Sequence, residues 1–451
     1  MNQLLPFTLI TCCFVMWGFT NDMTSALTTA FSRIFAVNAS EGGIINGANS
    51  LGYLIMAIPA AIFIQKYKFK TGVLAGLCVY AAGAILFLPS KAIGTIPPFL
   101  VSYFIMACGM AFLQTSCVPM IYCMGSEESG IGRLNLAQAF NALGTMIAMF
   151  VVHNVVLAGM SPMSVSRRMA LPTTQFEIIK NHDLAVLVQP YVFVSAIIVL
   201  LLVLIRIQPM KLLNDFNDGN KGLRERFTDI IKVKNYRESV LTGFFYTGAQ
   251  VCCWAYIIQY GVRIFMIEGV SETAAEMLSQ KYNIAAIVMF ATFRFICTWL
   301  LKYFNPEQFL SVMAITAFTF TIGAILFTDR NGLYCLIAVS ACMSLMFPTI
   351  NGIGLRGMNQ NVKLASAGFT MAIFGGAVFP FIQAAIIDSQ VVIMGLPSTN
   401  ISFIVPLLCF IVVAIFGHKA YVRQYISHDI HDHAEEQKWK PFSIRQIPFS
   451  Q

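Results

Sequence analysis

The chain has 451 residues, of which 57% are hydrophobic and only 11% are charged, and its net charge is +8. A soluble domain usually carries about a quarter charged residues, so this composition excludes an ordinary soluble globular protein. Apolar runs of about 20 residues recur along the whole chain, and each is long enough to cross a bilayer. We therefore expect an all-α integral membrane protein.

The apolar runs predict twelve membrane spans, with boundaries good to about two to four residues. They lie at 5–35, 44–64, 71–89, 97–123, 133–158, 187–207, 239–264, 279–300, 308–327, 332–355, 365–388 and 400–420. The first run lacks a basic n-region and carries Asp22, so we expect it to remain as a span rather than to be removed as a signal peptide.

The Lys and Arg residues predict the orientation. If the N-terminus lies in the cytoplasm, most of the 29 Lys and Arg residues fall in inner loops and the C-terminal tail. This is the positive-inside pattern, so we expect both termini to be cytoplasmic. The positive net charge is then explained by the membrane topology. We find no basic patch with aromatic residues that would indicate nucleic-acid binding.

The longest inner loop divides the spans into two groups of six. We expect an N-terminal half at 1–207, a cytoplasmic linker at 208–238, a C-terminal half at 239–420 and a cytoplasmic tail at 421–451. A weak internal repeat supports two related halves, because Lys66-Tyr67 follows the second span and Lys302-Tyr303 follows the eighth.

No metal or cofactor site is expected. The twelve cysteines fall within apolar segments without metal-type spacing to His, so we interpret them as packing residues rather than disulfide partners. The tail holds His428, His431 and His433, and a solvated tail is favoured over a metal site because no scaffold completes a ligand set.

Polar residues follow one another along three predicted spans of the first half. In the first span, Asp22 and Ser25 share one helix face, and Asn21 adjoins them. An Asp at the centre of a lipid-facing helix would cost at least about 2.5 kcal/mol, so these side chains should face the protein interior. The fourth span contributes Gln114, and the fifth contributes Asn135, Gln138 and Asn141.

The seventh span carries a second row, in which amides alternate with aromatic rings. Its members are Tyr246, Gln250 and Trp254 at four-residue spacing, followed by Gln259 and Tyr260. One alternative for any single residue is hydrogen bonding between membrane helices. Taken together, amides, hydroxyls and aromatic rings fit a neutral polyhydroxylated ligand, because amides donate and accept hydrogen bonds and a ring stacks on a sugar.

Three further polar residues have less specific interpretations. Arg263 is expected near the outer end of the seventh span, and Arg294 near the inner end of the eighth is expected to anchor a gating contact. His153 suits a proton relay or a packed neutral side chain equally well. A phosphorylated ligand would require paired basic residues at mid-depth, which we do not find.

These stretches resemble the L-fucose–proton symporter family of the major facilitator superfamily. The resemblance covers nearly the whole chain, through "WGFTND", "FLQTSCVP", "GSEESGIGRLNLAQAFN", "YTGAQVCCWAYIIQY" and "SLMFPTINGIGLRGMNQ". It implies the major facilitator fold, a bacterial inner-membrane sugar importer, and a central cavity in which Asp22, Gln138 and Asn141 match polar positions. The family's two cavity acids are replaced here by Ser25 and Gln114.

The resemblance leads to our functional hypothesis. We expect a monomeric secondary transporter that imports a neutral monosaccharide, L-fucose or a related hexose, with Asp22 as the candidate for the transported proton. A uniporter and a sodium-linked glucose/galactose carrier are the alternatives. A sugar sensor and an intramembrane enzyme are remote alternatives, because we find neither a signalling domain nor a nucleophile–base pair within the spans.

Overall fold

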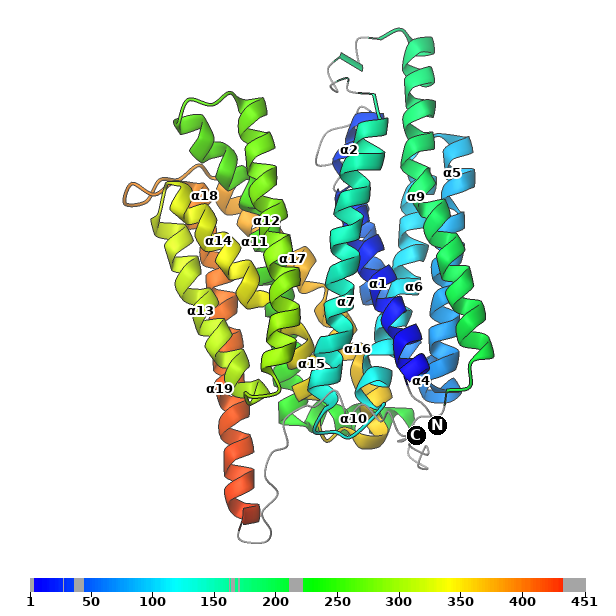
Figure 1. Ribbon diagram of the computed structural model, residues 1–451, viewed down its shortest axis with the longest axis vertical. Coiled ribbons are helices and arrows are strands. Elements are labelled where there is room, and N and C mark those ends of the chain that lie inside the picture. Colours follow the sequence, from blue (N-terminus) through cyan, green and yellow to red (C-terminus); the bar gives the residue numbers. More distant parts are fainter. Residues whose placement is uncertain are drawn as a thin grey trace. The chain divides into compact units, whose positions relative to one another are not determined.

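The computed structural model describes residues 4–26, 28–35, 44–161, 163, 167–168, 171–210 and 222–432. The regular secondary structure in this part of the chain is helical (Figure 1). The prediction of an all-α protein is confirmed.

The helices before the long loop correspond to the first six predicted spans. They are α1 (Leu4–Ala26), α2 (Thr28–Phe35), α4 (Ile44–Ile85), α5 (Phe87–Ile93), α6 (Ile96–Tyr122), α7 (Gly130–Val151), the π-helix η1 (Val152–Leu157) and α9 (Thr173–Ile207).

The remaining helices correspond to the loop and the last six spans. They are α10 (Leu223–Lys232), α11 (Lys234–Ile267), α12 (Glu272–Leu300), α13 (Pro306–Leu326), α14 (Arg330–Met343), α15 (Met346–Leu355), η2 (Asn359–Asn361), α16 (Val362–Ala372), α17 (Gly375–Asp388), α18 (Ser398–Ile401) and α19 (Ile404–Asp432).

Eleven helical segments of the described chain are long and apolar enough to cross a membrane. One of them, Gly47–Ile93, has 47 residues, about twice what a bilayer requires. Lys68 interrupts it, because its φ of 72° and ψ of 162° are not helical. This segment therefore holds the second and third predicted spans, and twelve spans result.

Several helices extend beyond the predicted spans. The helix of the sixth span begins at Thr173, well before residue 187, and the last helix continues to Asp432, past residue 420. The predicted linker contains a helix of its own, α10, and α11 follows it after Val233. Hydropathy detects only the part of a helix that is apolar, so polar helix ends were not expected.

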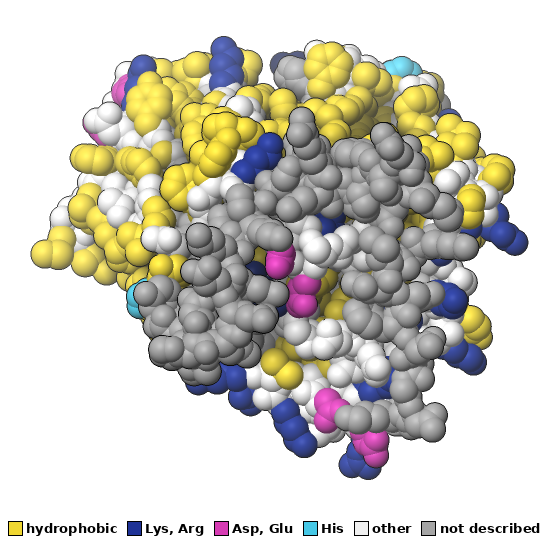
Figure 2. Space-filling model, turned by 60° about the horizontal axis from the view of Figure 1, so that its bottom comes forward, with side chains coloured by type: hydrophobic (Ala, Val, Ile, Leu, Met, Phe, Trp, Pro, Cys, Tyr) yellow, Lys and Arg dark blue, Asp and Glu magenta, His cyan; other side chains and the backbone are white. Residues whose placement is uncertain are grey.

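The described side chains leave large apolar residues on the surface. Phe150, Phe193 and Phe381 are exposed by 67%, 68% and 79%. Figure 2 shows hydrophobic side chains over the upper and left parts of the face it presents, with Lys and Arg side chains along its lower and right edges and at a few points along the top. Such a surface suits a protein whose solvent is lipid.

The described chain forms two compact units. The first consists of residues within Met1–Ile121 and Phe140–Asp215, and the second of residues within Tyr122–Ala139 and Phe216–Gln451. Helix α7 is divided between them, because its first ten residues, 130–139, pack with the second unit. The predicted half and linker boundaries remain predictions.

A buried ion pair organises the first unit where α7 is connected to α9. Arg168 Nη2 lies 2.6 Å from Asp183 Oδ2, and both side chains are fully buried. The other carboxylate oxygen of Asp183 accepts a hydrogen bond of 2.9 Å from the Ser161 N–H. This pair holds the connection against the beginning of α9, since neither charge would be stable here alone.

Candidate functional site

In the first unit, α1 and α7 touch through their backbones. A Cβ atom on Gly18 would lie 2.1 Å from the Asn141 carbonyl oxygen, and one on Gly144 would lie 2.1 Å from the Val15 carbonyl oxygen. Only glycine permits this approach. The Asn141 amide then reaches across to donate a hydrogen bond of 3.2 Å to the Phe14 carbonyl oxygen.

This close contact brings Asp22 against α7. The Thr145 hydroxyl donates a hydrogen bond of 2.7 Å to Asp22 Oδ2. Asp22 is half-buried, as is the neighbouring Asn21, whose side-chain oxygen accepts a hydrogen bond of 3.2 Å from the Asn49 amide. The predicted residues Asp22 and Asn141 therefore lie along the contact between α1 and α7, whereas Asn21 of α1 contacts α4.

Aromatic side chains support the same part of α1. The Trp17 indole N–H donates a hydrogen bond to the Tyr53 hydroxyl, and Tyr53 is almost fully buried in α4. Tyr53 lies close enough to Asp22 for an electrostatic interaction. Ser25 belongs to α1, but its side chain lies outside the described residues, as does that of His153.

Gln114 is buried in α6, with 2% of its surface exposed. Neither amide atom of its side chain has a hydrogen-bond partner in the described part of the chain. A buried polar group without a partner costs about 1–3 kcal/mol. Such a group therefore indicates a place where a water molecule or a ligand hydroxyl binds.

In the second unit, the first part of α7 contributes two further amides. The Asn135 amide donates hydrogen bonds to the Ile131 carbonyl oxygen at 3.0 Å and to the Thr349 hydroxyl at 3.2 Å. Its own oxygen has no partner, and neither does the Gln138 side-chain nitrogen, among the residues that the structure describes. Both side chains are buried.

The helix break between α14 and α15 explains the position of Tyr246. Pro348 has no N–H, so the Ser344 carbonyl oxygen four residues earlier lacks its usual helical donor. The Arg294 side chain donates to that oxygen at 2.7 Å, and the Tyr246 hydroxyl donates to the adjacent Met343 carbonyl oxygen at 2.8 Å. The Tyr246 hydroxyl therefore supports the break.

An aromatic cluster adjoins this break. The Trp254 indole N–H donates a hydrogen bond of 3.3 Å to the Ser340 hydroxyl, and its ring meets the Phe290 ring edge-on at 4.9 Å. The Arg294 guanidinium lies over the Phe290 ring, 4.6 Å from its centroid. Gln250, one turn from Trp254 on α11, is half-buried.

Arg294 connects this cluster to α7. Its Nη1 atom donates a hydrogen bond of 3.2 Å to the Gln138 carbonyl oxygen. Gln138, Arg294 and Trp254 thus belong to one continuous set of contacts in the second unit. The expectation that Arg294 anchors a gating contact remains a prediction.

Gln259 and Tyr260 lie apart from the cluster. Gln259 is exposed and lines an open hollow together with Arg263, Glu272 and Glu276. The Tyr260 hydroxyl donates to the carbonyl oxygens of Ala324 and Phe327, at 2.8 and 2.6 Å. The structure therefore does not bring these two residues to Trp254, and their proposed binding role remains an untested prediction.

Sequence reasoning missed Asn351. It is fully buried in α15, and neither amide atom has a hydrogen-bond partner among the described residues. The available signal was an Asn within the apolar stretch "MFPTINGIGL". Asn49 and Ser340 were also missed, because each acts through a predicted residue on another helix.

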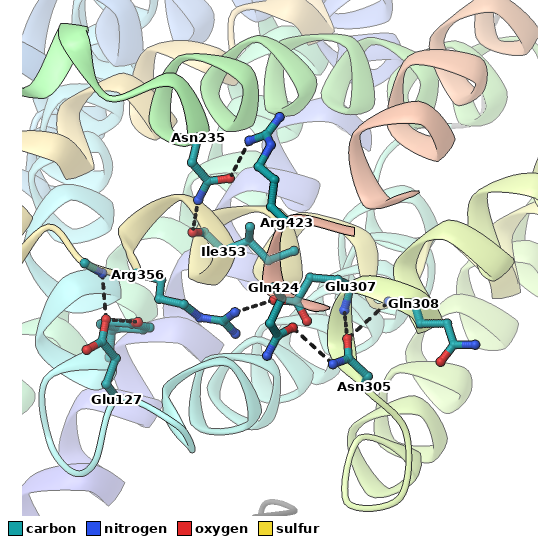
Figure 3. Close-up of polar contacts among 11 residues, drawn as sticks. Glu127, Asn235, Asn305, Glu307, Gln308, Ile353, Arg356, Arg423 and Gln424 are labelled. Atoms are coloured by element: carbon teal, nitrogen blue, oxygen red, sulfur yellow. Dashed lines mark hydrogen bonds and ion pairs between the residues drawn. The ribbon is translucent and has the colours of Figure 1, made fainter. Parts of the chain in front are cut away.

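Hydrogen bonds and ion pairs of charged side chains connect the ends of several helices of the second unit (Figure 3). Glu127, in the loop before α7, accepts a hydrogen bond of 2.6 Å from the Gly357 N–H. The neighbouring Arg356 pairs with Glu307 at the start of α13, at 2.5 Å. These residues lie in loops that the charge pattern assigns to the inner side.

A second group in Figure 3 joins α11, α15 and α19. The Asn235 amide donates a hydrogen bond of 2.9 Å to the Ile353 carbonyl oxygen, and Arg423 Nη1 donates one of 3.4 Å to the Asn235 side-chain oxygen. Arg423 also pairs with Glu238. The described chain contains no cluster of three or more His, Cys, Asp and Glu residues arranged to hold a metal.

Comparison with known proteins identifies the family. The family model of the Major Facilitator Superfamily matches residues 8–382. An L-fucose-proton symporter of Haemophilus influenzae is 40% identical to this chain over 426 residues, which cover 93% of this chain and 97% of the relative. This chain belongs to the L-fucose–proton symporter family.

Other members of the L-fucose–proton symporter family agree with this assignment. The Escherichia coli L-fucose-proton symporter is 32% identical over 420 residues, covering 92% of this chain and 93% of the relative. A crystal structure of FucP, a major facilitator superfamily transporter in the outward conformation, has a TM-score of 0.83 and 30% identity, covering 93% of this chain and 99% of that one.

Membership confirms the major facilitator fold that the sequence predicted, with its twelve membrane-spanning helices. It also confirms the predicted location, since this symporter-family chain is a multi-pass protein of the bacterial inner membrane. The family is one of membrane transporters.

Proposed function

We propose that this protein imports a neutral monosaccharide, L-fucose or a related hexose, together with a proton, by alternating access. Two relatives that are 40% and 32% identical over more than nine-tenths of this chain carry the name L-fucose-proton symporter. We further propose that it works as a monomer with both termini in the cytoplasm, and that it has no enzymatic activity.

The observation that carries the sugar proposal is a set of buried amide atoms that have no hydrogen-bond partner among the described residues. Gln114 has two such atoms and Gln138 has one. A sugar hydroxyl both donates and accepts a hydrogen bond, so it matches an amide better than an ion does. Trp254 supplies an aromatic ring in the cluster that includes Gln138, and sugar rings stack on such surfaces.

We assign the transported proton to Asp22. A proton symporter needs a group that changes charge between its two facing states, and a carboxylate within a membrane-spanning helix is suited to this because its environment alternates between dry and hydrated. The bond of 2.7 Å from Thr145 supports the assignment, because a hydroxyl can donate to the charged carboxylate and accept from the protonated one.

A uniporter and a sodium-linked glucose/galactose carrier are the alternative functions. The residues at positions 25 and 114, Ser and Gln, cannot exchange a proton at neutral pH, which is the specific reason to keep these alternatives. They predict sugar movement without a matching proton flux.

The experiment compares two transport modes in liposomes that contain wild type or Asp22→Asn. Exchange of labelled for unlabelled L-fucose requires no net proton movement, so the variant should retain it. Accumulation against a gradient requires coupling, so the variant should lose it. Asp388→Asn, an exposed residue at the end of α17, serves as the matched control and should accumulate L-fucose like wild type.

Uphill accumulation by Asp22→Asn would exclude Asp22 as the coupling group. A wild type that exchanges L-fucose but never accumulates it under a proton gradient would contradict symport and favour the uniporter. Accumulation that appears only with a sodium gradient would favour the sodium-linked carrier.

A further inference from the structure

The break between α14 and α15 is held by a side chain rather than by its own helix. Because Pro348 cannot donate, the Ser344 carbonyl oxygen takes its hydrogen bond from Arg294 Nε at 2.7 Å. A helix break inside a membrane is stable only where its freed carbonyl groups find other donors. Arg294, on α12, is therefore part of the break.

Arg294 makes a second contact of the same kind, to α7. Its Nη1 atom donates 3.2 Å to the carbonyl oxygen of Gln138, which belongs to the second unit. Only 4% of Arg294 is exposed, so the guanidinium is held by the protein and not by water. One planar group thus connects the α14–α15 break to α7.

The flat face of the same guanidinium packs on the aromatic cluster. It lies 4.6 Å from the centroid of Phe290, whose ring meets Trp254 at 4.9 Å. We propose that Gln138 and Trp254 contact sugar. Arg294 therefore touches the first of these residues directly and the second through Phe290. A ligand that repositions either of them must disturb the guanidinium.

We propose that Arg294 is a positioning residue that couples sugar occupancy to movement at the α14–α15 break, and this inference rests on the proposed function. When sugar engages Gln138 and Trp254, Arg294 releases the Gln138 carbonyl oxygen and keeps the Ser344 carbonyl oxygen. The α14–α15 break, which Arg294 still holds through the Ser344 carbonyl oxygen, is then no longer connected to Gln138, and α15 swings at residues 344–348. The Asn135–Thr349 hydrogen bond of 3.2 Å continues to join α7 to α15.

The geometry requires arginine. A lysine ammonium is a point charge on a flexible stem, whereas the guanidinium is a planar fork that can bond two carbonyl oxygens and stack on a ring at once. Arg294→Lys should therefore keep the charge and the fold but lose the coupling. This variant remains informative if Arg294→Met fails to fold.

The test measures three quantities for wild type, Arg294→Lys, Arg294→Met and Pro348→Ala. They are the L-fucose Kd by calorimetry, the rate of L-fucose exchange in liposomes, and the thermal unfolding midpoint. Arg263→Met is the control, because Arg263 is also an arginine of the second unit but donates a hydrogen bond of 3.2 Å to the Asn400 side-chain oxygen. Its exchange rate should match wild type.

We expect both Arg294 variants to exchange L-fucose about tenfold more slowly while their Kd changes by less than about threefold. Pro348→Ala supplies the missing N–H to Ser344, so it should unfold at the same or a higher temperature and yet exchange more slowly. Opposite changes in stability and rate would not arise from a purely structural role.

The inference is overturned if Arg294→Lys or Pro348→Ala exchanges at the wild-type rate. It is also overturned if the Kd of Arg294→Lys rises in parallel with the loss of rate, because Arg294 would then bind sugar directly. In both of these cases the wild type still exchanges L-fucose, so the proposed function stands. A wild type that neither binds nor exchanges L-fucose would contradict both the proposed function and this inference.

Discussion

The Thr145 hydroxyl donates a hydrogen bond of 2.7 Å to the carboxylate of Asp22, which lies 123 residues earlier in the chain. This bond joins α7 to α1 within the first unit. It gives a membrane-embedded carboxylate a fixed donor, and it can be removed without changing the shape of the contact.

Thr145→Val tests whether this bond acts on the transported proton. A hydrogen bond to a charged group contributes about 1.5–3 kcal/mol, so Thr145→Val removes a strong contact that fixes the Asp22 carboxylate against α7. Thr145→Val should therefore lower proton-driven accumulation of L-fucose in liposomes while L-fucose exchange stays near the wild-type rate. Thr145→Ser keeps a hydroxyl and should retain the wild-type value. Wild-type accumulation by Thr145→Val would show that this bond has no part in proton coupling.

Gly144→Ala tests the close approach of α1 and α7. The new Cβ atom would lie 2.1 Å from the Val15 carbonyl oxygen, so the two helices must separate. Overpacking of this kind costs about 1–3 kcal/mol and should also lengthen the Asp22–Thr145 bond. The matched control is Gly47→Ala in α4, where a Cβ atom meets nothing within 4 Å. Equal unfolding midpoints for the two variants would show that the contact tolerates a side chain.

Gln138→Ala and Asn141→Ala should differ in one respect. Each should weaken L-fucose binding by about 1–3 kcal/mol, the cost of leaving a buried partner unpaired. Asn141 also bonds to the Phe14 carbonyl oxygen, so only Asn141→Ala should lower the unfolding midpoint. Calorimetry and thermal unfolding in detergent give the two quantities. Wild-type affinity in both variants would assign these residues to helix packing.

Asp183→Asn tests the buried ion pair of the first unit. The substitution leaves the Arg168 guanidinium without its counter-charge in a fully buried place, which should cost about 3–5 kcal/mol. The control is Glu177→Gln, because Glu177 pairs with Lys180 at 3.0 Å but is 47% exposed, and such pairs contribute at most about 1 kcal/mol. A small effect at Asp183 would mean that water reaches the pair.

The membrane spans could be predicted from the sequence because an apolar run of bilayer length is a strong signal. The interruptions could not be located in the same way. Lys68 breaks α4 through its backbone angles, and the α14–α15 break lies four residues before Pro348, inside a single predicted span. Hydropathy does not distinguish a continuous helix from two helices joined by a satisfied break.

The candidate site was predictable in its residue types but not in its pairings. The four-residue spacing along α11 placed Tyr246 with Trp254, yet the Tyr246 hydroxyl bonds to the Met343 carbonyl oxygen. Spacing fixes the face of a helix, whereas the partner depends on which carbonyl groups a neighbouring helix has left free. Asn351 was missed for a related reason, since a single amide in an apolar span carries no periodicity.

The division of α7 between the two units has a consequence for biogenesis. Asn135 can bond to Thr349 only after another 214 residues have been synthesised. The Gln138 carbonyl oxygen can bond to Arg294 only after another 156. At roughly 5–20 residues per second, the ribosome needs on the order of 10–40 s to supply the first of these partners. During that interval the early part of α7 lies in the nascent membrane protein without the late helices that complete its hydrogen bonds. An insertion chaperone that shields this helix would therefore act between synthesis of the fifth span and synthesis of the tenth.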